Sequence, residues 1–139
     1  MPASLQEVGL AVKRLQWRHH RTANARLAAV GLSLVQWDVL RHLHERPEAS
    51  LHELAQLTFQ TDQSMGALAG RMVDRELLER VAGAGRAVRH RITERGDEAR
   101  RAGSDVLDGV LQESFGGLTP AQLEQLHTLL TLANGAEVP

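Results

Sequence analysis

Residues 50–93 hold the sequence pattern that most constrains the fold of this chain: two short helices followed by a hairpin. The first helix begins with a capping box, in which the Ser50 hydroxyl and the Glu53 carboxylate satisfy free amides of the first turn. Phe59-Gln60 form a tight connection, and Thr61 is a favourable N-cap for the second helix. The pattern therefore predicts two consecutive helices with a turn of only a few residues between them.

The hairpin is predicted by two short strands, at 77–81 and 88–93, joined through Gly83-Ala84-Gly85. Glycine accepts the positive φ angles that tight hairpin turns require. In the second run arginines alternate with less polar side chains, which is the period of a strand with one solvated face. Two helices closed by such a hairpin predict a winged helix-turn-helix, whose second helix enters the DNA major groove. The chain is therefore predicted to be a DNA-binding regulator.

Composition is consistent with a single-domain protein. A chain of 139 residues suits one domain, or one domain with an added dimerisation element. No run of about 18 apolar residues is present to span a membrane, and no signal-peptide pattern is recognised. The absence of cysteine excludes oxidant sensing by thiols and thiolate metal sites. We expect a cytoplasmic protein that makes no use of a membrane.

Charge is distributed unevenly along the chain, although the formal net charge is only -1. Residues 80–91 hold four arginines and no acidic residue, whereas residues 104–139 hold five acidic residues and no Lys or Arg. This asymmetry favours a polyanionic partner for the basic segment. The alternative is that the arginines form an ordinary solvated face.

Apolar residues at helical spacing predict further helices on both sides of the helix-turn-helix. One helix runs over about 4–30 and stops at Gly31, and another opens at a capping box that begins with Ser33. After the hairpin, one helix covers about 94–115 and a last one is capped by Thr119. The predicted fold is mainly α with a small β-hairpin wing.

The whole chain, 1–139, is predicted to form one domain with a DNA-binding lobe over about 32–95. The segments at about 4–30 and 94–134 are predicted to be dimerisation helices that flank this lobe. An amphipathic helix must bury its apolar side, either on its own domain or on another chain. A second copy is the favoured partner, because symmetric dimers match DNA sites with two-fold symmetry.

The second helix of the motif is predicted to pack through one face and to contact DNA through the other. Gln63 and Ser64 lie near its N-terminus, where recognition helices meet base edges, and glutamine pairs with adenine through two hydrogen bonds. The alternative for both residues is a solvated first turn. The small side chains of this helix favour contacts to phosphates and recognition of DNA shape. The candidate contacts on this helix are Thr61, Gln63, Ser64, Ala67 and Arg71.

The wing contributes further candidates. Arg86 follows the Gly-Ala-Gly turn closely and is the first choice for a contact to the minor groove or to phosphate. Arg89 is the second choice. For Arg91, a structural ion pair is an equally consistent role.

These residues resemble the MarR family of bacterial transcriptional regulators. The most specific segment runs from Leu54-Ala55 through Arg71 to Leu77-Leu78-Glu79-Arg80, and continues over 88–93 to Gly96. The resemblance covers most of the chain. Three features depart from the family pattern. Glu76 stands at a position that usually holds glycine, and Ala67 at a position that often holds a longer polar or basic residue. The wing is short and lacks the usual Asp-rich approach to its arginine.

The resemblance implies a homodimer with interlocked terminal helices that binds a pseudo-palindromic operator, and in many members releases it on binding a small, often phenolic, ligand. A pocket for a small aromatic ligand is then expected between the dimer helices and the DNA-binding lobe. Its candidate residues supply aromatic walls and a cation: Trp17, Arg18, His20, Trp37 and His42. The alternative is that both tryptophans are core or interface residues.

The sequence contains no motif for a metal site, a cofactor or an enzyme. The neighbours His19-His20 point in different directions on a helix, and no HExxH sequence or carboxylate-rich ligand cluster is present. Two functions remain. One is a sequence-specific, homodimeric repressor that binds double-stranded DNA and is released by an aromatic ligand. The other is a winged-helix scaffold that binds protein partners, or DNA without a ligand response.

Overall fold

A computed structural model describes residues 1–82 and 88–135. The described elements are α1 (Leu5–Leu27), η1 (Ala28–Val30), α2 (Leu34–Glu45), α3 (Leu51–Leu57), α4 (Asp62–Asp74), β1 (Leu78–Ala82), β2 (Val88–Ile92), α5 (Glu94–Phe115) and α6 (Pro120–Asn134). The mainly helical chain with one antiparallel hairpin confirms the predicted fold class. Among the described residues, no helix is long and apolar enough to cross a membrane.

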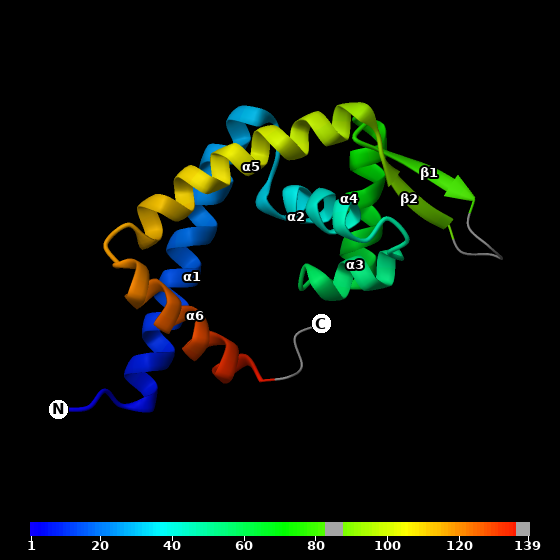
Figure 1. Cartoon of the computed structure of the whole chain (residues 1–139). Helices are drawn as coiled ribbons and strands as arrows, with labels where there is room; N and C mark the ends of the chain where they lie inside the picture. The colour runs from blue at the N-terminus through cyan, green and yellow to red at the C-terminus, as the bar shows by residue number, and fades with distance from the viewer. Residues whose placement is uncertain (83–87, 136–139) are drawn as a thin grey trace.

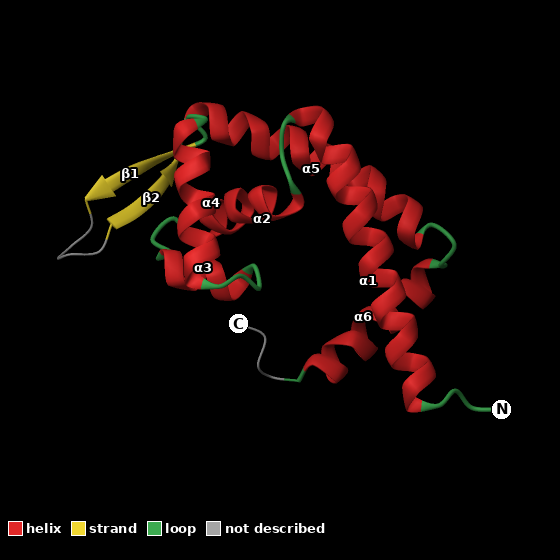
Figure 2. Cartoon of the chain, turned by 180° about the vertical axis from the view of Figure 1, so that it is seen from behind, coloured by secondary structure: helices red, strands yellow, loops and turns green. Residues whose placement is uncertain are grey.

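The long helix α5 connects two parts of the molecule (Figure 1). One end of α5 packs on α2 and on the hairpin, and the rest lies along α1 before the chain turns into α6. Seen from behind, α2, α3 and α4 cluster beside the hairpin, while α6 and the N-terminal part of α1 lie apart from that cluster (Figure 2). We call the cluster of α2, α3, α4 and the hairpin the lobe.

The hydrophobic core lies mainly in this lobe. Leu40 of α2, Leu54 of α3, Met65 and Met72 of α4, and Leu78 of β1 are fully buried. Burial of one such side chain stabilises a fold by roughly 1.5–3 kcal/mol. The core therefore fixes α4 against the other elements of the lobe, and this packing sets which face of α4 is left to solvent.

The helix starts follow the local sequence. Ser33 and Thr119 form capping boxes, Thr61 caps α4, and Gly31 has a φ of +76°, which suits its position after η1. Only the first half of the predicted Ser50–Glu53 capping box forms. The Ser50 hydroxyl accepts from the amide of Glu53 at 3.1 Å. The Glu53 carboxylate, however, accepts from the Ser50 hydroxyl at 3.4 Å instead of from the Ser50 amide, so the predicted role of Glu53 was wrong.

The hairpin pairs in a regular antiparallel register, in which Leu78 faces Ile92 and Arg80 faces His90. Thr93 follows β2, and its amide donates to the carbonyl of Leu77 at 3.1 Å. Its hydroxyl also caps α5 by accepting from the amide of Gly96 at 2.9 Å. The base of the wing is thereby tied to the start of α5. The glycine turn predicted over 83–85 lies outside the described residues.

Glu76 has a φ of +62° in the turn between α4 and β1. A side chain in this left-handed region costs about 1–2 kcal/mol that glycine does not pay. We expect Glu76→Gly to be more stable than Glu76→Ala by about 1 kcal/mol in urea unfolding. The Ala variant is the matched control, because both changes remove the exposed ion pair to Arg95 at 3.3 Å. Equal unfolding midpoints would show that this turn is not strained.

Candidate nucleic-acid interface

The helix α4 has one buried face and one exposed face, as the sequence predicted. Met65, Leu68, Ala69 and Met72 are buried against the lobe. The opposite face is exposed and carries all the candidate contacts predicted on this helix: Thr61, Gln63, Ser64, Ala67 and Arg71. The structure therefore brings these five residues together on one surface of the lobe.

The first turn of α4 is fixed by its cap. The Thr61 side chain accepts from the amide of Ser64 at 3.0 Å, and the side chains of Gln63 and Ser64 are exposed. The middle of the exposed face carries little side-chain bulk, because it holds Gly66 and Ala67. A Cβ atom added at Gly66 would meet nothing within 4 Å. A helix with so little side-chain bulk can approach a DNA groove closely, while its polar first turn supplies the hydrogen-bonding groups.

A histidine and an aspartate bridge the starts of α3 and α4, and sequence reasoning missed this pair. His52 Nδ1 lies 2.9 Å from Asp62 Oδ1 and 3.1 Å from Oδ2. His52 is the second residue of α3 and Asp62 is the first residue of α4. The two positions are ten residues apart, which is no helical repeat, so no periodic signal connects them.

The arginines of the wing differ in their contacts. Arg91 forms an ion pair with Glu79 of the neighbouring strand at 2.6 Å, which is the structural role that the sequence allowed for it. Arg89 is half-buried, and its Nη1 donates to the carbonyl of Glu48 at 2.6 Å. The Arg89 guanidinium therefore holds the wing against the loop before α3. Arg86, the first choice for a DNA contact, lies outside the described residues.

His90 packs the inner side of the wing. Burial, together with the positive charge of Arg80, lowers the pKa of His90, so the buried ring is neutral at neutral pH. With Leu43, His44 and Asp97 it lines a small cavity of about 220 Å³ between α2, β2 and α5. A neutral, buried ring at this position lets β2 pack on α2 and α5 without burying a charge.

The predicted ligand residues fall into two separate groups. Trp17, Arg18 and His20 line an open depression of about 720 Å³ along α1. The Trp17 and His20 rings stack with their centroids 6.2 Å apart, and His20 shares a hydrogen bond with Asn24. Trp17 remains 58% exposed, so an aromatic surface is available at this depression.

The other two predicted ligand residues, Trp37 and His42, lie on α2 and do not line this depression. The indole of Trp37 donates to the carbonyl of Arg100 at 3.2 Å. The guanidinium carbon of Arg41 lies over the Trp37 ring, 5.3 Å from the ring centroid. Trp37 therefore joins α2 to α5, which is the packing role that the sequence analysis kept as an alternative. His42 is half-buried, and this burial, followed by the charge of Arg41, lowers the pKa of His42.

Over residues 1–82 and 88–135, no group of three or more His, Cys, Asp or Glu side chains is placed to hold a metal ion. The exposed face of α4 carries the polar side chains of Thr61, Gln63 and Ser64. Together with the hairpin wing, it defines the chain as a winged helix-turn-helix protein.

Comparisons with known proteins show what this winged helix is similar to. The MarR family model matches residues 30–87. The HTH-type transcriptional repressor IacR of Pseudomonas putida is 28% identical over 119 residues, which are 84% of this chain and 71% of the repressor. Over residues 30–87, the chain is therefore similar to the MarR family.

Solved structures of the family share the fold. A MarR family protein of Mycobacterium tuberculosis in complex with salicylic acid is 25% identical, with a TM-score of 0.75 over 93% of this chain and 95% of that one. A mutant of Escherichia coli MarR complexed with operator DNA is 19% identical, with a TM-score of 0.80 over 88% of this chain and 90% of that one. At 19% identity, the similarity to Escherichia coli MarR shows a shared fold and nothing more.

Proposed function

We propose that this chain is a homodimeric transcriptional repressor that binds a pseudo-palindromic operator through α4 and the wing of each copy. The observation that carries the proposal is the exposed polar face of α4, set by the burial of the opposite apolar face. The relative from Pseudomonas putida is a transcriptional repressor, and a protein of the same fold was solved with operator DNA. The chain would act by binding rather than by catalysis, in the bacterial cytoplasm.

The roles on α4 follow from position. Gln63 and Ser64 are proposed to contact base edges, because they lie in the first turn of the recognition helix. Arg71 is exposed on the same face and is proposed to bind phosphate. Arg86 of the wing keeps its proposed contact to the minor groove or to phosphate on the strength of the sequence.

Dimerisation is proposed to use the ends of the chain, about 4–30 and 94–134, around a lobe at about 32–95. Every side chain of α6 is exposed except that of Leu126, which is half-buried. The N-terminal part of α1 also exposes apolar side chains, with Leu5 at 92% and Val8 at 51%. Such faces on two helices that lie apart from the lobe would be buried by a second copy (Figure 2).

The proposed ligand is a small aromatic acid that binds at the depression on α1. Trp17 supplies an aromatic surface, and Arg18 supplies a cation for a carboxylate. The solved complex of the Mycobacterium tuberculosis protein with salicylic acid supports this ligand class. We restrict the proposal to Trp17, Arg18 and His20, because Trp37 and His42 lie in the packing of α2.

Fluorescence anisotropy with the DNA upstream of the protein's own gene tests this function. We expect tight binding that survives competitor DNA and falls steeply with salt, because phosphate contacts release counterions. Adding salicylate to the complex is expected to release the DNA. Weak binding that is equal on any duplex would instead favour the scaffold function, and specific binding that no aromatic acid weakens would remove the ligand response.

A further inference from the structure

An acidic residue, Asp62, lies beside the proposed base-contacting residues and is in contact with His52. Asp62 directly precedes Gln63 in the first turn of α4, and its side chain is 68% exposed. A carboxylate at this position would face the negative charge of DNA, and like charges brought together across an interface are unfavourable. His52, whose side chain is 65% exposed, is the group that the structure places against this carboxylate.

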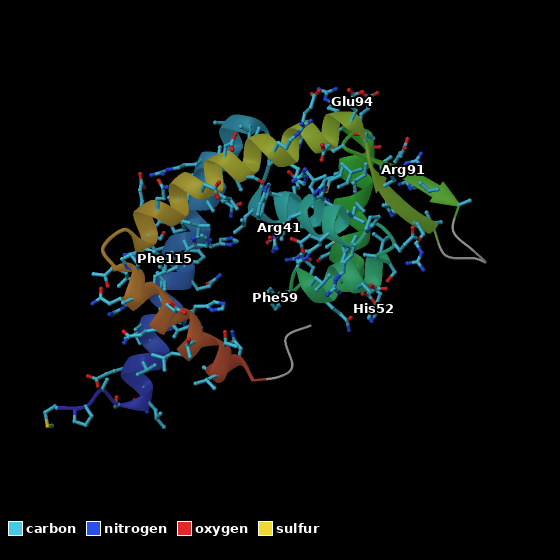
Figure 3. All side chains as sticks on the ribbon, in the orientation of Figure 1. Arg41, His52, Phe59, Arg91, Glu94 and Phe115 are labelled. Carbon is cyan, nitrogen blue, oxygen red and sulfur yellow. The ribbon has the colours of Figure 1, made fainter. Side chains whose placement is uncertain are left out.

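The pair contributes little to the fold. Exposed ion pairs stabilise proteins by about 0–1 kcal/mol, and both side chains are mostly exposed. Figure 3 shows His52 at the outer edge of the lobe. His52 lies on α3, the first helix of the helix-turn-helix, which crosses the DNA backbone when the second helix enters the groove. The imidazole therefore lies on α3, the helix proposed to contact phosphates, and is hydrogen-bonded to α4, the helix proposed to contact bases.

The hydrogen-bonding capacity of the ring has a direct consequence. Ionised Asp62 can only accept hydrogen bonds, so His52 Nδ1 must carry the hydrogen that it shares with the two carboxylate oxygens. In a neutral ring the other nitrogen, Nε2, then has no hydrogen. Phosphate oxygens accept as well, so Nε2 can bind a phosphate only when the ring carries both hydrogens and a positive charge.

We propose that His52 is a phosphate-binding residue, held by Asp62 and bound to the DNA backbone as an imidazolium, so that DNA binding takes up one proton at each lobe. The inference rests on the proposed DNA-binding function. The Asp62 carboxylate contacts the ring, and the next residue on α3, Glu53, makes its own contact to the Ser50 hydroxyl. Protonation also offsets the repulsion between Asp62 and the phosphates.

The test is DNA affinity as a function of pH, measured by anisotropy on the upstream DNA at fixed salt between pH 6 and pH 8. The wild-type protein is expected to lose roughly tenfold or more in affinity over this range, where a histidine changes charge. His52→Gln, which keeps a hydrogen-bond donor but cannot gain a charge, is expected to lose most of this dependence. It is also expected to lower the salt slope by about one per bound phosphate contact.

Two further variants separate this role from a structural one. His44→Gln changes a histidine of α2 that also contacts a carboxylate, that of Asp97 at 3.9 Å, and is expected to keep the wild-type pH dependence. Asp62→Asn removes the repulsive charge, so it is expected to bind more tightly than wild type at pH 8 and to respond less to pH. Calorimetry in two buffers of different ionisation enthalpy measures the proton uptake itself, which is expected in the wild type and absent in His52→Gln.

The outcomes distinguish this inference from the function on which it rests. Specific binding by the wild type with an unchanged pH dependence in His52→Gln would overturn the role of His52 and leave the repressor function in place. Binding that is weak and equal on every duplex at every pH would remove the DNA-binding function, and the role of His52 with it.

Discussion

Replacing Gly96 by alanine is expected to lower the free energy of unfolding by about 3 kcal/mol, the upper part of the range for overpacked sites. Gly96 is the third residue of α5 and is buried. A Cβ atom at this position would lie closer than 3.0 Å to the carbonyl oxygen of Leu77, and 3.0 Å from Cγ2 of Ile92. Because the Leu77 atom belongs to the backbone, no change of rotamer can relieve the clash.

The clash falls on the junction between the wing and α5. The same Leu77 carbonyl accepts from the amide of Thr93, and Thr93 caps the helix that contains Gly96. Moving α5 away from β1 would therefore stretch the bond that fixes the base of the wing. We expect any folded fraction of Gly96→Ala to bind DNA more weakly, because the wing and α4 would no longer keep their relative positions.

Urea unfolding followed by circular dichroism measures this effect, and Gly109→Ala is the matched control. Gly109 also lies within α5, but an added Cβ would meet nothing within 4 Å. Alanine in a helix interior is favoured over glycine by about 0.5–1 kcal/mol, so this variant should be slightly more stable than the wild type. Similar stabilities for the two variants would refute the close approach of α5 to Leu77.

The features that the sequence predicted are those set by neighbouring residues. The caps at Ser33, Thr61 and Thr119 join positions three residues apart, and the buried face of α4 follows the helical repeat. Glu53 shows the limit of this local reasoning. Its amide is capped as predicted, but its carboxylate accepts from the Ser50 hydroxyl instead of from the Ser50 amide.

The features that the sequence did not predict depend on tertiary packing. Arg89 bonds to a carbonyl 41 residues away, and Trp37 bonds to the carbonyl of Arg100 across 63 residues. Contacts between residues so far apart in the sequence leave no periodic pattern from which they could be predicted. The predicted ligand residues are grouped by expected location and by chemistry, and their separation follows from how α1 and α2 pack. His52 and Asp62 were missed for the same reason, since only the fold brings the two helix starts together.

Replacing Ala67 by glutamate is expected to weaken operator binding by about 100-fold or more, because like charges juxtaposed in an interface cost several kcal/mol. Ala67 is exposed on the polar face of α4, between Ser64 and Arg71. A carboxylate there would enter the groove with the recognition helix. It would also stand four residues before Arg71, the favourable spacing for an ion pair within a helix, and so draw the Arg71 guanidinium away from phosphate.

Anisotropy with the upstream DNA at fixed salt measures the effect, and Ala67→Gln is the control. Glutamine has nearly the shape of glutamate and a similar helix propensity, but no charge. Both variants should keep the wild-type unfolding midpoint, because Ala67 makes no part of the buried face. A large loss for glutamate with a small loss for glutamine assigns the DNA-facing surface to this side of α4. Equal affinities for the two variants would mean that the groove is not met by this face, and that Gln63, Ser64 and Arg71 need another role.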